Sequence, residues 1–237
     1  MSDHAAHVPT VVATVKLMAS IAAIYMNMSP MNDMPRVRAK IPIDMLPILC
    51  MFANGSLWTL YGVLVQNWFP LVATNVVGMT LSGYYLVVIY THAGTYRGTA
   101  AKKIVFTLGL VSSAVVYAVY GTHMHVHHVA THVGYAGIAV CTLMVASPLS
   151  SAGTVFKHKS AASLPFKMIT AGIACSFLWL SFGVLIHDVF VIAPNAVNLV
   201  LGLFQLVLCF VYPGPPAKTD ADIELPTKPA ATDSTKK

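Results

Sequence analysis

Two tryptophans and two asparagines recur at matching places in the two halves of this 237-residue chain. Trp58 and Asn75 lie in the first half, and Trp179 and Asn195 follow them about 120 residues later. An indole ring offers a flat face to the C–H bonds of a sugar ring, and an amide both donates and accepts hydrogen bonds, as sugar hydroxyls require. Tryptophan is also common at membrane interfaces, where we expect Trp68. The four repeated residues together indicate a hexose-binding site.

Long apolar runs must position these residues. Hydrophobic residues make up 57% of the chain and charged residues 9%, whereas soluble domains carry about 25% charged residues. A bilayer core needs about 20 apolar residues per helix. The chain contains seven such runs, at 9–30, 42–65, 69–91, 103–121, 132–156, 164–186 and 189–212. The sequence therefore predicts an all-α membrane protein with seven transmembrane helices.

The basic residues predict how the chain is oriented. All 14 Lys and Arg except Lys16 follow the first, third and fifth runs or lie in the C-terminal tail, which places them on one side of the membrane. Because cytosolic loops are rich in Lys and Arg, we expect the N-terminus outside and the C-terminus in the cytosol, in the plasma membrane. No basic cluster is interleaved with aromatic residues, so the net charge of +6 does not indicate nucleic-acid binding.

Prolines and glycines extend the repeat. Each half places Pro, Pro, Trp, Gly and Asn in one order across three runs, and the fourth run is left as a linker. An odd linker inserts both three-helix units in the same direction, with a site between them. The expected organisation is an extracytosolic N-terminus (1–8), a first repeat (9–91), a linker helix with a His-rich outer loop (92–131), a second repeat (132–213) and a disordered cytosolic tail (214–237).

These residues resemble the SWEET (MtN3/saliva) family over roughly 12–213 of the chain. The motifs that carry the resemblance are Ser29-Pro30, Asn54-Gly-Ser-Leu-Trp58, Ala146-Ser-Pro-Leu-Ser150 and Pro194-Asn195. Phe182 and Asn198 depart from the Tyr and Gly usual in that family. The resemblance implies two parallel three-helix bundles joined by a linker helix, and bidirectional uniport of a sugar by alternating access.

The resemblance also implies roles for residues outside the repeated four. Asn54 and Cys175, one turn before each tryptophan, would complete the pocket in the manner of members that prefer monosaccharides such as glucose. Tyr61 and Asp188 would form an outer-gate hydrogen bond, although Asp188 could equally be a solvated loop carboxylate.

Four prolines form a matched pair of pairs near the predicted cytosolic ends. They are Pro30 and Pro47 in the first half and Pro148 and Pro165 in the second. By resemblance they are the hinges of an inner gate, because proline removes a backbone donor and weakens the helix locally. Gln205 could satisfy some of the carbonyl groups that are left free.

Charged residues are nearly absent from the spans. No Asp or Glu lies between the expected membrane faces, and Lys16 can extend to the membrane surface. Proton-coupled carriers usually hold a titratable group at membrane depth. The composition therefore favours passive transport without a cofactor.

A His-rich stretch occupies the outer loop after the fourth run. His123, His125, His127 and His128 could bind zinc or copper. The stretch lacks Cys or carboxylate partners, so a polar loop is the favoured interpretation and a metal site the minor one.

Other classes of protein remain as alternatives. A PQ-loop-type carrier of another solute has the same architecture, and a seven-span receptor has the same number of helices. An enzyme is not indicated, because no nucleophile–base pair lies at membrane depth. The expected partners are a sugar, the lipid bilayer and, as family members do, further copies of the chain.

Overall fold

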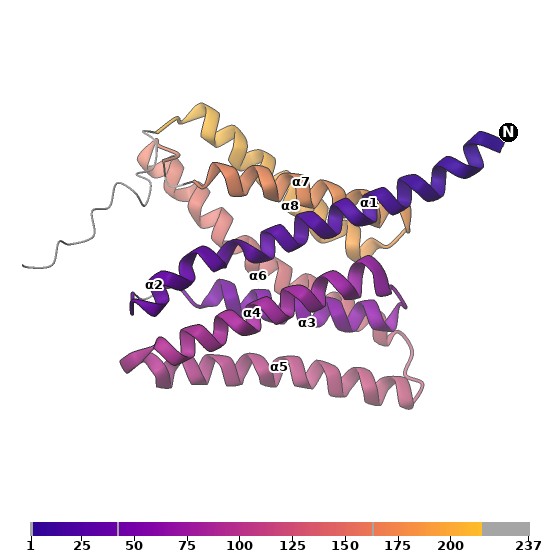
Figure 1. The fold of residues 1–237 in the computed structure, drawn as a ribbon, viewed down its shortest axis with the longest axis horizontal. Helices are drawn as coiled ribbons and strands as arrows, with labels where there is room; N and C mark the ends of the chain where they lie inside the picture. Colours follow the sequence, from indigo (N-terminus) through magenta and orange to yellow (C-terminus); the bar gives the residue numbers. More distant parts are fainter. Residues whose placement is uncertain (1, 42, 163, 215–237) are drawn as a thin grey trace, which may run out of the picture.

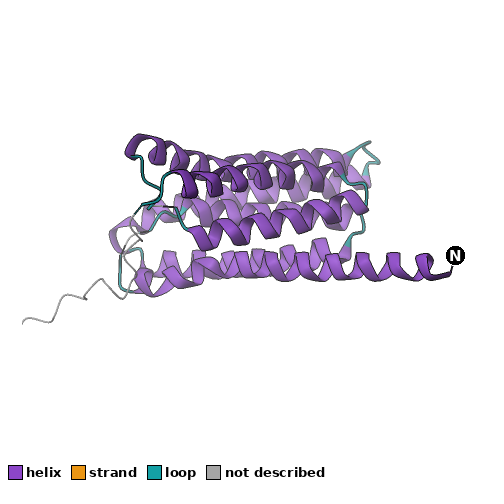
Figure 2. Ribbon diagram, turned by 90° about the horizontal axis from the view of Figure 1, so that it is seen from above, coloured by secondary structure: helices purple, strands orange, loops and turns teal. Residues whose placement is uncertain are grey.

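The computed structural model describes residues 2–41, 43–162 and 164–214, except for the side chains of residues 2–8 and 146–148. Residues 215–237, almost all of the expected tail, lie outside this description. Within the described ranges the chain forms helices joined by short loops, without a strand (Figure 2). The all-α prediction is confirmed.

Seven helical segments are long and apolar enough to span a bilayer, as the sequence predicts. The first comprises α1 (Ser2–Met28), the 3₁₀ turn η1 (Ser29–Asp33) and α2 (Met34–Arg38). The others are α3 (Leu46–Leu64), η2 with α4 (Trp68–Val72 and Ala73–His92), η3 with α5 (Gly94–Tyr96 and Arg97–His123), α6 (Val129–His158), α7 (Phe166–Leu185) and α8 (Val189–Val211). Helix α1 begins at Ser2, ahead of the expected span, and extends beyond the bundle (Figure 2).

The helices form two groups of three with a linker. Helix α4 packs on α1 and α3, and α8 packs on α6 and α7. Between the groups, α1 packs on α7 and α3 packs on α6. These two contacts are equivalent in the repeat, because α6 corresponds to α1 and α7 corresponds to α3. Figure 1 shows α1 and α6 crossing obliquely between the other helices. Linker α5 packs on α3, α4 and α6. This is the predicted arrangement of three, one and three helices.

The repeat extends to close packing at two glycines. A Cβ atom on Gly62 would lie 2.8 Å from a methyl carbon of Val72, and one on Gly183 would lie 3.0 Å from a side-chain carbon of Ile192. In both halves the missing side chain lets the following span begin against the preceding helix. Equivalent glycines therefore allow the same close contact between consecutive spans in both halves.

The described ends of the chain lie at opposite ends of the bundle (Figure 1). We call the end that carries Lys40, Lys103 and Lys159 the basic end, and the other the outer end.

Two of the four prolines are not placed where they would break a helix. Pro47 lies in the first turn of α3 and Pro165 is the N-cap residue of α7. Backbone N–H groups at a helix start have no partner within the helix, so proline removes no hydrogen bond there. Pro30 is the second residue of η1, where the α-helix of the first span gives way to a 3₁₀ turn. Pro47 and Pro165 interrupt no helix, the side chain of Pro148 lies outside the described set, and the hinge role of the four prolines stays a prediction.

Candidate functional site

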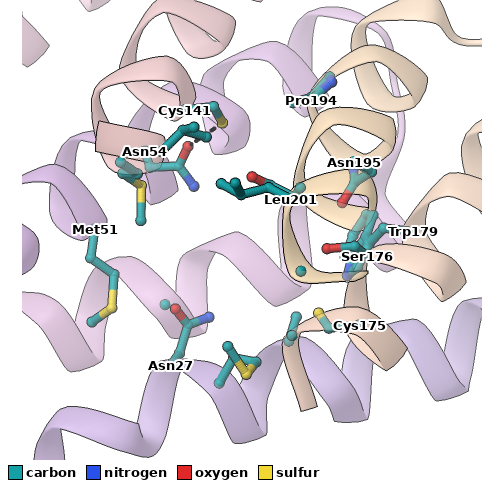
Figure 3. A pocket seen from close by; sticks show the side chains of 18 of the residues that line it. Asn27, Met51, Asn54, Cys141, Cys175, Ser176, Trp179, Pro194, Asn195 and Leu201 are labelled. Atoms are coloured by element: carbon teal, nitrogen blue, oxygen red, sulfur yellow. Dashed lines mark hydrogen bonds between the residues drawn. The ribbon is translucent and has the colours of Figure 1, made fainter. Parts of the chain in front are cut away.

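A cavity of about 510 Å³ lies between the two three-helix groups. Figure 3 shows side chains of both groups facing one another across it. All six residues expected to bind the substrate line this cavity: Asn54, Trp58 and Asn75 from the first half, and Cys175, Trp179 and Asn195 from the second. The structure thus brings the expected set together, while its role in binding stays a prediction.

The two repeated asparagines have the same environment. The Asn75 side chain donates from Nδ2 to the carbonyl oxygen of Leu71 at 2.9 Å, and Asn195 does so to Val191 at 2.8 Å. Each acceptor lies one turn earlier on the same helix. The bond fixes the amide orientation and leaves its oxygen as an acceptor for a ligand in the cavity.

The two repeated tryptophans are equally buried but are held differently. Trp58 Nε1 donates to Asn54 Oδ1 at 3.0 Å, one turn back on α3. Cys175 stands at the corresponding place in the second half, and Trp179 Nε1 instead donates to the carbonyl oxygen of Ala19 on α1 at 3.1 Å. Trp179 therefore ties the second half to the first, an asymmetry that the repeat alone does not predict.

A hydrogen bond joins the two halves at the outer end, between the residues expected to form an outer gate, a role that stays a prediction. The Tyr61 hydroxyl lies 2.9 Å from both carboxylate oxygens of Asp188. Asp188 is also the N-cap of α8, where Oδ1 accepts from the backbone N–H of Phe190 at 2.9 Å. The alternative of a freely solvated carboxylate is therefore not what the structure shows. Beneath the pair, a core cluster includes Trp58, Trp179 and the fully buried Phe182.

The cavity extends from the tryptophans toward the basic end. Its lining there includes Pro165, Met168 and the buried Gln205. Ser29 of the η1 turn meets Met168 of α7, with its hydroxyl 3.6 Å from the sulfur. Pro165 thus lines the basic end of the cavity, next to the contact between the first span and the second bundle.

Several polar residues of the lining were missed. Asn27, Ser176 and Asn198 line the cavity together with the thiol-bearing Cys141, whose Sγ lies 3.0 Å from Asn54 Oδ1. A lone Asn in an apolar run was the available signal for Asn27. It packs on Gly78, where a Cβ would lie 2.8 Å from its Nδ2.

Chemically, the cavity combines a mostly apolar wall with uncharged polar groups. Among its described lining residues there is no Asp, Glu, Lys, Arg or His. Amides supply most of the hydrogen-bonding groups. Methionine and cysteine supply much of the apolar wall, from Met26, Met51, Met144, Met168, Cys141 and Cys175. Such a cavity suits a neutral polar solute with apolar faces.

The His-rich loop and Lys16 lie apart from the cavity lining. No three His, Cys, Asp or Glu side chains of the described residues are grouped as a metal site would require. Lys16 lies over the Phe182 ring, with Nζ 5.9 Å from its centroid. The minor interpretation of the His-rich loop as a metal site therefore has no support among the described residues.

Comparison with known proteins divides the chain into the same two repeats as the structure does. The model of a family described as "Sugar efflux transporter for intercellular exchange" matches residues 13–97 and again 131–217. The two matches correspond to the two repeats, with most of α5 and the following loop between them.

Individual relatives carry similar names. "Sugar transporter SWEET1" of Drosophila pseudoobscura pseudoobscura is 32% identical over 71% of this chain and 74% of its own. "Bidirectional sugar transporter SWEET7b" of Oryza sativa subsp. japonica is 28% identical over 79% of this chain and 72% of its own. A solved structure of a eukaryotic SWEET transporter superposes with a TM-score of 0.75 at 22% identity, covering 85% of this chain and 96% of that one. The chain therefore belongs to the SWEET (MtN3/saliva) family, a family of transporters rather than of enzymes.

Proposed function

We propose that this protein carries a sugar, in either direction and down its gradient, across the membrane that its seven helices span. The observation that carries the proposal is the cavity between the two bundles, where each half contributes one tryptophan and one asparagine. Apolar ring faces and fixed amides match the two kinds of surface on a sugar. The names of the relatives support the same class of solute.

A monosaccharide such as glucose is the favoured cargo. Asn54 and Cys175, the pair implied by the family resemblance, both line the cavity. Asn27 and Asn198 add two amides near them, so that several hydroxyls of one ring can be bonded at once. Uniport is favoured because the described lining residues carry no titratable carboxylate that could couple transport to protons.

Alternating access is the mechanism that this geometry supports. The Tyr61–Asp188 bond joins the halves at the outer end, whereas the cavity extends toward the prolines at the basic end. We interpret the conformation as one that is closed outward. Breaking the Tyr61–Asp188 bond would remove one of the hydrogen bonds between the two bundles, at the outer end, and favour rocking of the bundles about the cavity. We further propose that the outer end faces away from the cytosol, as the charge distribution predicts, and that the membrane is the plasma membrane.

The test is uptake of radiolabelled glucose by cells that lack their own hexose carriers. Trp179→Ala and Asn75→Ala should abolish most uptake, while Trp68→Ala, which removes an exposed ring outside the cavity, should retain it. A protonophore should have no effect. Equal uptake by all three variants would contradict the site, and loss of uptake with the protonophore would contradict uniport.

A further inference from the structure

A second cavity, of about 260 Å³, lies at the basic end of the first bundle. It shares no lining residue with the central cavity. Four segments enclose it: α2, the loop to α3, the end of α4 with the loop that follows, and the first two turns of α5. Its lining residues include Val37, Lys40, Ile43, Asp44, Ile89, His92, Tyr96, Thr99 and Lys103. The volume lies just below the usual range of about 300–1,000 Å³ for ligand pockets, a size suited to a headgroup.

The charged groups of this pocket are mostly basic. Lys40 follows α2, Lys103 comes from α5, and His92 from the last turn of α4. Asp44 is the acidic residue of the lining, and its Oδ1 is occupied by the backbone N–H of Leu46 at 3.0 Å. His92 Nδ1 donates to the Val88 carbonyl oxygen at 2.9 Å, so Nε2 is an acceptor in the neutral ring and a donor only in the imidazolium form. The pocket thus presents positive charge to whatever enters it.

The two lysines differ from the neighbouring arginines in having no partner. Arg38 donates to the Tyr84 hydroxyl at 2.8 Å, and Arg97 is bonded to the carbonyl oxygen of Thr91 at 3.2 Å. Neither the Lys40 nor the Lys103 ammonium has a hydrogen-bond or ion-pair partner among the residues described. Two exposed ammonium groups from separate segments therefore border one pocket without a protein partner among the described residues.

In the second half, the lysine that corresponds to Lys40 is Lys159, and its side chain makes a different contact. Lys159 ends α6 as Lys40 follows α2, and both have left-handed backbones, with φ of 52° and 63°. Lys159 lies over the ring of Tyr212, with Nζ 5.2 Å from its centroid. His92 occupies the place of Tyr212 in the first half. Linker α5, which follows the first half, supplies Lys103. The repeat therefore provides an internal comparison, in which one lysine is used for packing and its counterpart borders a pocket.

We propose that this pocket binds a phosphate monoester. At neutral pH such a group carries a charge of about −1.5 to −2 and three acceptor oxygens, which the two ammonium groups can bond together. Carboxylates offer less charge and fewer acceptors to a pair of ammonium groups. The same chemistry is found in the headgroup of a phosphorylated inositol lipid and in a soluble hexose phosphate.

The experiment measures binding by the purified full-length protein in phosphatidylcholine nanodiscs. One arm titrates glucose-6-phosphate, with glucose as the uncharged control. The other arm incorporates phosphatidylinositol-4-phosphate, with phosphatidylserine as the control for general negative charge. Two double variants remove the same net charge: Lys40→Gln with Lys103→Gln inside the pocket, and Lys102→Gln with Lys159→Gln outside it. Melting temperatures establish that both variants are folded.

We expect the pocket variant to weaken phosphate binding about tenfold or more, because charge-assisted hydrogen bonds are lost, and the outside variant to leave binding unchanged. Binding in only one of the two arms would support the site and would show whether its ligand is a soluble sugar phosphate or a lipid headgroup. If neither phosphate ligand binds in preference to its control, the proposal is wrong. The proposal is also wrong if both double variants weaken binding to the same extent, because binding would then depend on the overall surface charge and not on this pocket.

Discussion

Replacing Tyr61 with Phe should open the outer end of the carrier. The substitution removes a hydroxyl that lies 2.9 Å from both Asp188 oxygens, and it keeps the ring contacts with Trp58 and Phe190 at centroid distances of 5.5 and 5.6 Å. The N-cap bond from Asp188 to α8 is also kept. A hydrogen bond to a charged group contributes about 1.5–3 kcal/mol. The outward-open population should therefore rise roughly 10- to 150-fold.

Native cysteines can report this change. Cys141 and Cys175 line the central cavity, whereas Cys50 does not. A membrane-impermeant maleimide is added on the side that Tyr61 faces, and the modified peptides are quantified by mass spectrometry over time. Labelling of Cys141 and Cys175 should accelerate in Tyr61→Phe, with Cys50 as the internal reference. Unchanged labelling of the cavity cysteines would refute the assignment of Tyr61 and Asp188 to the outer closure.

Gly183→Ala should lower the free energy of unfolding by about 1–3 kcal/mol through overpacking, while Gly109→Ala, with open space around the new methyl, should be neutral or stabilising. Thermal unfolding in detergent compares the two, and equal shifts would contradict the packing analysis. Asn54→Ala removes the acceptor shared by Trp58 Nε1 and the Cys141 thiol. It should raise KM for uptake about tenfold, from the loss of about 1–3 kcal/mol of hydrogen bonding. Treatment with a metal chelator should change neither uptake nor melting temperature, because no metal-binding group of three is found among the described residues; a loss of either would restore the His-rich loop as a metal site.

Much of the fold could be predicted because the bilayer imposes a length and a composition on each span. The repeat then fixed which residues lie at the same depth. Trp58 and Trp179, with Asn75 and Asn195, face one cavity because equivalent helices meet about a common axis. These placements follow from sequence spacing and helix insertion alone.

The remaining features depend on contacts that spacing does not specify. Asn27 reaches the lining by packing on Gly78, a residue two spans away. Trp179 bonds to Ala19, whereas Trp58 bonds within its own helix, because the second half has a cysteine where the first has an amide. Pro47 has no ladder to break because the helix begins beside it. The exact start of a helix depends on the loop before it, which hydrophobicity does not determine.

The central claim is that a sugar crosses through the cavity between the bundles without coupling to another gradient. Counterflow of labelled glucose into proteoliposomes preloaded with unlabelled glucose, with no ion gradient imposed, tests it most directly. The wild-type protein should show a transient accumulation of label, and the double variant Asn75→Ala, Asn195→Ala should show none. No counterflow by the wild-type protein with glucose or any other monosaccharide, or equal counterflow by the double variant, would contradict the account.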